Sequence, residues 1–305
     1  MTEAPPEGPG GSGDGSEGPR RAAVLGSPVA HSLSPAMHRA AYAAMALDGW
    51  TYDAREVTEA ELPGVLAACG PEWAGLSLTM PLKRAVLPLL DELDDVARAT
   101  GVVNTVTWRG EGAAREALGA NTDVEGIAGA LRPLLAAAPE HGVVLGGGAT
   151  AVSAVAALAD LGCRRVVALV RSPERAAALR EVGARSGVEV TLEPFAEAGA
   201  RTAAADVVVS TAPAGAADAL AAEVAAGTQD AQQGVLLDVV YDPWPTALAA
   251  AWRGPVVDGF EMLVRQAVGQ VRLMTGVAPS PDLLREAGLA ERRRRAAAAA
   301  GRQVP

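Results

Sequence analysis

Two residue types that this chain otherwise avoids are gathered in one stretch. Lys83, within SLTMPLKRAV at 77–86, is the single lysine of a chain whose other basic residues are arginines. Asn104 and Asn121 are its two asparagines, and a threonine follows each of them. Lysine can release and take back a proton, whereas arginine stays protonated in proteins. A coding bias toward arginine is the alternative explanation for one surviving lysine. The retained residue types favour a polar site within residues 83–121.

Lys83 and Asp123 together offer an acid/base device. GLSLTMPLK places Thr79 and Lys83 just past a strand end, where ligands bind in α/β sheets, and GANTDVEG places Asp123 between the two halves of the chain. A carboxylate can orient an ammonium group, which can then donate a proton to a developing alkoxide. The alternatives are a surface salt bridge and a helix cap at Asp123, and the spacing leaves them open.

The segment VVLGGGATAVSA at 143–154 is typical of a phosphate-binding turn. It predicts a strand, a glycine turn and a helix start, with the spacing Gly146-x-Gly148-x-x-Ala151. Glycines let the backbone approach a pyrophosphate, and the helix N-terminus offers free N–H groups and partial positive charge. Glycine triplets also end strands in ordinary turns, but the strand–turn–helix–strand order favours a nucleotide.

The next strand, RRVVALVR, indicates which nucleotide. An NAD site usually ends this strand with an acid for the ribose 2′-hydroxyl. Here the strand ends Val170-Arg171-Ser172, with Arg175 one turn further on, and arginine with a hydroxyl suits a 2′-phosphate. We therefore expect NADP as the cofactor. The alternative of a solvated surface arginine is more serious for Arg175 than for Arg171.

GSPVAHSLSPAMH at 26–38 presents two hydroxyls, Ser32 and Ser34, just ahead of a helix. Such a pair beside a helix N-terminus makes a plausible carboxylate site. On local sequence alone, the preferred alternative is that Ser34 only caps the helix. His31 and His38 are expected to be structural.

Bulk composition excludes several classes of function. The chain has 305 residues, enough for two domains, and a net charge of −10, which argues against a nucleic-acid binder. ERRRRAAAAAGR at 291–302 is expected to end a solvated helix or tail. Cys69 and Cys163 are expected to be buried thiols in a reducing, cytoplasmic setting, and we expect no metal site and no membrane span. The Gly/Pro-rich residues 1–20 are expected to be a disordered leader.

Apolar runs and helical periodicity alternate along the chain, which indicates a parallel or mostly parallel α/β sheet. The expected strands are 21–26, 50–57, 73–80, 102–108, 142–148, 164–170, 188–194, 205–213, 234–243 and 255–259. The expected helices are 34–49, 58–70, 124–138, 149–162, 172–184, 245–252, 260–276 and 280–294.

In combination, these motifs resemble those of the shikimate dehydrogenase family. The match runs from about Ala23 to Gly276 and keeps the family's motif order: GSPVAHSLSP, SLTMPLK, GVVNT, GANTDVEG, GGGATA, VRSPERA, STAPAG, DVVYDPWPT and GFEMLVRQA. The resemblance implies reversible reduction of the C3 ketone of 3-dehydroshikimate by NADPH, in aromatic amino acid (chorismate) biosynthesis. The implied roles are Lys83 and Asp123 as the catalytic pair; Ser32, Ser34 and Tyr241 on the substrate carboxylate; Thr79, Asn104, Asp123 and Gln266 on the ring hydroxyls; Gly146, Gly147, Gly148, Ala149 and Ala151 on the pyrophosphate; Arg171, Ser172 and Arg175 around the 2′-phosphate; and Gly259 and Met262 beside the nicotinamide.

The chain departs from the family pattern at two informative positions. The lysine motif more commonly begins Asn-Val-Thr, but here it reads Ser77-Leu78-Thr79, so one supporting hydrogen bond is expected to be weaker or rearranged. Val170 stands where the NADP loop commonly has Asn, which removes a polar contact near the adenosine. Neither change removes a catalytic group.

The resemblance implies an α/β fold class with two domains. An α/β substrate-binding domain is expected at 21–122, completed by returning C-terminal helices at 259–290. A Rossmann-like, doubly wound NADP-binding domain is expected at 123–258, and a C-terminal tail at 291–305. The protein is expected to be a monomer or homodimer that binds a small-molecule substrate. The alternatives are a quinate dehydrogenase that uses NAD, and a non-catalytic nucleotide-binding sensor on the same fold.

Overall fold

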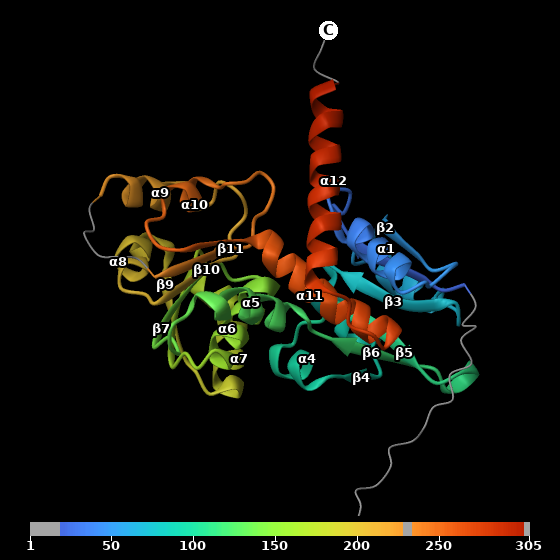
Figure 1. Cartoon of the computed structure of the whole chain (residues 1–305). Helices are drawn as coiled ribbons and strands as arrows, with labels where there is room; N and C mark the ends of the chain where they lie inside the picture. Colours follow the sequence, from blue (N-terminus) through green and yellow to red (C-terminus); the bar gives the residue numbers. More distant parts are fainter. Residues whose placement is uncertain (1–18, 228–233, 302–305) are drawn as a thin grey trace, which may run out of the picture.

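The chain folds into two α/β lobes, each built on a six-stranded sheet (Figure 1). The computed structural model describes residues 19–227 and 234–301. The expected leader therefore lies outside the described residues up to residue 18, as does the expected tail from residue 302. Strand order is β2-β1-β3-β5-β6-β4 in the first lobe and β12-β11-β10-β7-β8-β9 in the second.

The first sheet is mixed: three of its five strand pairings are parallel, including that of β4 with β6, and two are antiparallel. Strands β1, β2 and β3 run parallel, while β5 is antiparallel to both β3 and β6. The hairpin β5–β6 was not expected from the sequence, nor was the short β4. A connection of only 110–115 between β5 and β6 is too short for a crossover, so these strands must be antiparallel. The strands are β1 (Arg21–Gly26), β2 (Thr51–Glu56), β3 (Trp73–Leu78), β4 (Glu92–Leu93), β5 (Thr105–Arg109) and β6 (Glu116–Ala120).

The second sheet is entirely parallel, and its central strands are buried on both faces, as continuous Val/Leu runs predict. From β7 the chain winds outward through β8 and β9, then returns to the other side of β7 through β10. This doubly wound order puts the topological switch point between β7 and β10, where ligands bind in such sheets. The strands are β7 (His141–Leu145), β8 (Arg165–Val170), β9 (Glu189–Pro194), β10 (Val207–Ser210), β11 (Val235–Asp238) and β12 (Val256–Asp258).

Two helices, α5 and α11, pack against each other between the lobes (Figure 1). Their backbones approach closely because Gly126 of α5 has no side chain: a Cβ there would lie 2.9 Å from Cβ of Gln266 on α11. Since α5 begins at Asp123, this packing brings Asp123 beside α11. The helices are α1 (Ser34–Ala44), α2 (Leu62–Ala67), α3 (Leu82–Ala85), α4 (Asp95–Thr100), α5 (Asp123–Leu131), α6 (Ala149–Asp160), α7 (Ala177–Ser186), α8 (Ala198–Ala203), α9 (Asp218–Ala225), α10 (Ala247–Ala251), α11 (Gly259–Thr275) and α12 (Pro281–Gly301).

The C-terminal helices return to the first lobe and complete its core. Val264, Val271 and Met274 of α11 are buried in one apolar cluster with Val24 and Met37 of that lobe. Helix α12 packs on α1 and α11 and continues to Gly301, seven residues beyond the expected end at 294, so that it projects from the body (Figure 1).

Two further findings concern the cysteines and the apolarity of the helices. Cys69 and Cys163 are buried free thiols, as expected. Across residues 19–227 and 234–301, no helix combines the length and apolarity that a membrane span requires.

Candidate active site

Residues of both lobes and of α5 and α11 line one cavity of about 260 Å³. This cavity collects residues that the sequence analysis selected from motifs far apart in the chain. They are Ser32, Ser34, Thr79, Lys83, Asp123, Tyr241, Gly259, Met262 and Gln266.

Lys83 and Asp123 form a largely buried ion pair on the wall of this cavity. Lys83 Nζ donates to Asp123 Oδ2 at 2.5 Å, and the side chains are only 14% and 4% exposed. The pair is therefore not a surface salt bridge. Asp123 is not the cap of α5 either, because Thr122 occupies the cap position. The remaining interpretation, an ammonium group held by a carboxylate beside a ligand cavity, has the geometry that proton transfer needs.

Asn104 lies behind Asp123 rather than on the cavity wall. Its Nδ2 donates to Asp123 Oδ1 at 2.8 Å, to Thr122 Oγ1 at 2.9 Å and to Gln266 Oε1 at 3.3 Å. Its Oδ1 accepts from the Thr122 backbone N–H at 2.9 Å, which fixes the orientation of the amide. The expected contact of Asn104 with the ring hydroxyls stays a prediction, and the described contacts of its amide nitrogen are with Asp123, Thr122 and Gln266. Asn104 thereby orients the carboxylate of Asp123.

The other asparagine supports the same residue from the backbone side. Asn121 Oδ1 accepts from the Asp123 backbone N–H at 3.1 Å. Its Nδ2 donates to the hydroxyls of Thr100 and Ser153, each at 3.1 Å. Both retained asparagines therefore hold Asp123 in place.

Ser32, Ser34 and Tyr241 all line this cavity. The backbone N–H of Ser34 donates to Ser32 Oγ at 3.2 Å. The alternative that Ser34 caps α1 is wrong, because Leu33 is the cap residue and no side chain caps this helix. Burial raises the pKa of Tyr241, while the nearby guanidinium groups of Arg295 and Arg292 act in the opposite direction.

A buried hydrogen-bond chain, which was not expected from the sequence, ends at Asn104. Tyr52 OH donates to Ser77 Oγ at 2.6 Å, and Ser77 Oγ donates to Gln270 Oε1 at 2.9 Å. Gln270 Nε2 then donates to the backbone carbonyl of Asn104 at 3.1 Å and to Thr105 Oγ1 at 3.2 Å. Ser77, at the position where the family commonly has Asn, thus contacts Gln270. Its position one helical turn after Gln266 was the signal that could have found it.

His38 packs beneath this chain. Its ring stacks on Tyr52 with centroids 4.0 Å apart, and neither ring nitrogen has a hydrogen-bond partner among the described residues. Burial lowers its pKa to about 3, so the imidazole is neutral at pH 7.

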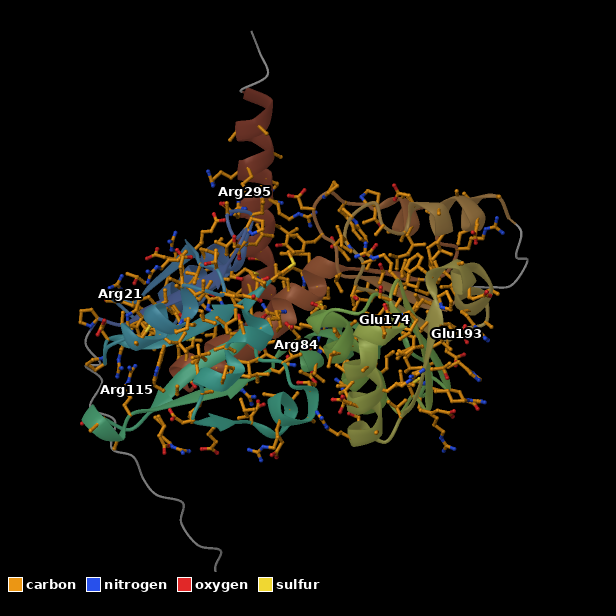
Figure 2. All side chains as sticks on the ribbon, turned by 180° about the vertical axis from the view of Figure 1, so that it is seen from behind. Arg21, Arg84, Arg115, Glu174, Glu193 and Arg295 are labelled. Atoms are coloured by element: carbon orange, nitrogen blue, oxygen red, sulfur yellow. The ribbon has the colours of Figure 1, made fainter. Side chains whose placement is uncertain are left out.

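A second cavity of about 650 Å³ meets the first at the lysine. Thr79, Lys83 and Thr150 line both cavities. The second cavity is also lined by Gly146, Gly147, Gly148, Ala149 and Arg171. Arg84 lies between the lobes, where it lines the same cavity (Figure 2). A third cavity of about 410 Å³ continues past Gly147, Gly148, Arg171 and Ser172.

The glycine turn has the shape that a pyrophosphate requires. Gly146 has φ +116°, and a Cβ there would lie 2.5 Å from Thr211 Oγ1, so a larger residue would be excluded on both grounds. Helix α6 starts immediately afterwards, with Gly148 as its cap residue, and its N-terminus faces the cavity. Ala151 is fully buried in this helix and lines none of the three cavities described here.

The end of β8 suits a phosphate rather than a ribose hydroxyl. Among the described residues, no acid pairs with the guanidinium group of Arg171, which lines the second and third cavities. Ser172 lies beside it. Arg175 belongs to a 3-10 turn at Pro173–Ala176, and its side chain is not among those that the structure describes. Within the described part of the chain, no three His, Cys, Asp or Glu side chains form a metal-binding group.

Comparisons with known protein families match three successive parts of the chain. The description "Shikimate dehydrogenase substrate binding domain" matches residues 24–106, "Shikimate / quinate 5-dehydrogenase" matches 134–240, and "Shikimate 5'-dehydrogenase C-terminal domain" matches 259–287. The chain is 37% identical over 271 residues to a shikimate dehydrogenase (NADP(+)) of Thermus thermophilus, covering 88% of this chain and 97% of the relative. It is 33% identical to two pentafunctional AROM polypeptides of Lodderomyces elongisporus but spans only 18% of their length.

Solved structures show the same architecture. Shikimate dehydrogenase of Mycobacterium tuberculosis has a TM-score of 0.78 and 42% identity, covering 89% of this chain and 99% of its own. A shikimate 5-dehydrogenase from another strain of Thermus thermophilus, solved with NADP(H) and shikimate, has a TM-score of 0.74 and 33% identity, with coverage of 89% and 99%. Quinate dehydrogenase of Corynebacterium glutamicum, solved with NAD, has a TM-score of 0.78 and 30% identity, with the same coverage. The chain therefore belongs to the shikimate dehydrogenase family.

Proposed function

We propose that this chain is an NADP-dependent oxidoreductase that interconverts 3-dehydroshikimate and shikimate in chorismate biosynthesis. The observation that carries the proposal is the meeting of two cavities at Lys83. One cavity is lined by the hydroxyl, amide and carboxylate groups that a polyhydroxylated carboxylic acid would need, and the other by the glycine turn. A substrate and a nucleotide that occupy them would meet beside the Lys83–Asp123 pair.

The residues of this chain account for the proton in the reaction. NADPH, when bound, supplies the hydride for the C3 ketone. Lys83 Nζ donates its proton to the ketone oxygen, which becomes the C3 hydroxyl, and takes that proton back when shikimate is oxidised. Asp123 holds the ammonium group in the orientation for transfer, and Asn104 holds Asp123.

The proposed roles of the other residues follow from the cavity that each of them lines. Ser32, Ser34 and Tyr241 would bind the substrate carboxylate, and Thr79 and Gln266 would bind ring hydroxyls. Gly259 and Met262, on the first cavity, would lie beside the nicotinamide. The turn at 146–149 would hold the pyrophosphate, and Arg171, Ser172 and Arg175 the 2′-phosphate. The absence of an acid after β8, at Val170-Arg171-Ser172, supports NADP over NAD.

The proposal includes a domain assignment and a setting. Residues 21–122 with 259–290 would form the substrate-binding domain, and 123–258 the NADP-binding domain. The family matches at 24–106, 134–240 and 259–287 support these limits. A cytoplasmic location and a monomeric or homodimeric state complete the proposal.

Initial rates at the absorbance band of reduced nicotinamide test the function. Shikimate and quinate are each paired with NADP and with NAD. Turnover of shikimate with NADP, and much slower turnover of the other pairs, is the expected result. Preference for quinate or NAD would overturn the proposed specificity for shikimate or NADP, but would be consistent with the proposed acid/base role of Lys83 and Asp123. A chain that binds NADP but turns over no pair would instead be a sensor.

A further inference from the structure

The arginine run near the C-terminus does not form a uniformly solvated face. Helix α12 packs along α1 and α11, and its arginines differ in exposure and in the groups they contact. The side chains of Arg292 and Arg295 are 28% and 34% exposed, whereas that of Arg294 is 69% exposed. Among the described residues, the polar contacts of Arg294 are confined to Glu291. Arg292 and Arg295 reach the active-site region instead.

Arg295 holds the loop that carries Ser32. Its Nη2 donates to the backbone carbonyl of Ser32 at 2.9 Å, and its Nη1 donates to that of Ala30 at 3.5 Å. Its Nε donates to Glu291 Oε1 at 2.6 Å, which fixes the guanidinium group on α12. Figure 2 shows Arg295 on α12 beside the first lobe. The planar group therefore ties the serine loop to the C-terminal helix.

Arg292 holds the segment that carries Tyr241, which follows β11 of the second sheet. Its Nη2 donates to the backbone carbonyl of Tyr241 at 2.9 Å, and its Nη1 donates to Asp258 Oδ2 at 3.3 Å. The guanidinium group also lies over the ring of Phe260, 5.5 Å from the centroid. One turn of α12 thus contacts both lobes, because residues three apart in a helix are neighbours on its surface.

The positive charge of Arg292 and Arg295 lies near a part of the cavity that has few basic side chains. Among the described residues that line the first cavity there is one lysine, which is paired with Asp123, one histidine, His31, and no arginine. The part of the wall formed by Ser32, Ser34 and Tyr241 offers only neutral hydroxyls. A carboxylate bound there would be stabilised by positive charge placed behind the wall. Arg295 and Arg292, which pair with Glu291 and Asp258, still contribute positive potential at this place, because both act to lower the pKa of Tyr241.

We propose that Arg292 and Arg295 are positioning residues for the substrate carboxylate. They set the separation of Ser32 and Tyr241 through the two backbone carbonyls, and they give this end of the cavity a positive potential. The inference rests on the proposed function, because it assumes that the carboxylate of the substrate binds at these hydroxyls.

The test compares R292A, R295A and the double variant with R294A, a matched control from the same run. We expect each single variant to raise the KM for shikimate by about tenfold, because a charge-assisted contact that fixes a binding group is lost. The kcat and the KM for NADP should stay within about twofold of wild type, since neither arginine touches Lys83 or the glycine turn. R294A should match wild type.

Salt dependence provides a readout that a merely structural role would not produce. Added salt should raise the KM for shikimate in the wild type and in R294A, and should do so less in the double variant, because screening acts on charges that the variant lacks. If the alanine variants melt below the assay temperature, R292K and R295K replace them. They should raise this KM by about threefold and keep the salt dependence, because lysine keeps the charge but lacks the planar fork.

The outcomes separate the two proposals. A KM for shikimate in R292A and R295A equal to that of R294A would overturn the positioning role. So would a parallel rise in the KM for NADP, since that would indicate general damage. No shikimate turnover by the wild type with NADP would overturn the proposed function and this inference with it.

Discussion

The two asparagines allow a sharp test of how Asp123 is held. N104D replaces an amide by a carboxyl at a position that is 1% exposed, where the amide nitrogen lies 2.8 Å from Asp123 Oδ1. Two carboxylates at that separation would repel by about 6 kcal/mol at an effective dielectric constant of about 20. Keeping the introduced carboxyl protonated at pH 7 costs only about 4 kcal/mol from a reference pKa of about 3.9. The introduced carboxyl should therefore bind a proton and donate it to Asp123, as the amide does.

This balance predicts a pH-dependent defect. The repulsion between two carboxylates and the cost of keeping one of them protonated become equal at about pH 8. The ammonium group of Lys83 and the N–H of Thr122 lower this pH, because both favour the ionised carboxylate. The kcat/KM of N104D, relative to wild type, should fall by about tenfold or more between about pH 6 and pH 9. The pKa of the introduced carboxyl is raised by folding, so the loss of stability is absent below about pH 4 and grows as the pH rises through the folded-state pKa.

The assay is the initial rate of nicotinamide reduction by shikimate across this pH range, with thermal melting of each variant at the same pH values. N121D is the matched control: it makes the same chemical change at a buried asparagine whose Nδ2 faces the hydroxyls of Thr100 and Ser153. Those hydroxyls can turn to donate, so its ratio to wild type should stay flat. A flat ratio for folded N104D, or the same slope for N121D, would refute the reasoning.

Three further variants test other parts of the site. K83R keeps the charge but cannot cycle a proton, so turnover should fall by about 10²–10⁴-fold while NADP still binds; near-normal turnover would contradict the role of Lys83. R171A should raise the KM for NADP by about tenfold and leave that for NAD unchanged, and an equal rise in both would argue against the 2′-phosphate contact. Burial lowers the pKa of His38 from 6.5 to about 3. Between these two pH values the folded state binds fewer protons than the unfolded state, so the protein loses stability as the pH falls from 6.5 toward about 3. H38F keeps a ring against Tyr52 and should flatten this loss in urea unfolding measured at several pH values; an unchanged slope would show that other groups cause it.

Much of the second lobe could be predicted from the sequence because each of its parts carries a local signal. Parallel strands buried on both faces read as apolar runs, and the turn from Gly146 to Gly148 stands between such a strand and a helix. The first lobe was harder, because the hairpin β5–β6 has short strands that carry Thr, Glu and Arg. Its antiparallel direction follows from a short connection rather than from residue pattern.

The catalytic pair could be predicted only as a pair of residue types. Lys83 and Asp123 are forty residues apart, and their contact depends on how α3 and α5 are placed in the fold, which no local pattern specifies. The support around them depends equally on tertiary structure. Gln270 reaches Ser77 from a different element, and Arg295 reaches Ser32 across almost the whole chain. Interactions over such separations are decided by where whole helices pack.

The return of α11 to the first lobe has a consequence for biosynthesis. A chain emerging from the ribosome presents all six strands of the second sheet before any residue of α11 exists. Val24 and Met37 are made early, yet Val264, Val271 and Met274, which pack in the same cluster, are made more than 200 residues later. Although N-terminal domains usually fold first during synthesis, we expect the cluster around Val24 and Met37 to be completed only after the second lobe has been made. The early segment must wait with apolar surface exposed, so a chaperone that binds this protein is expected to engage the first lobe until residues 259–290 have been released.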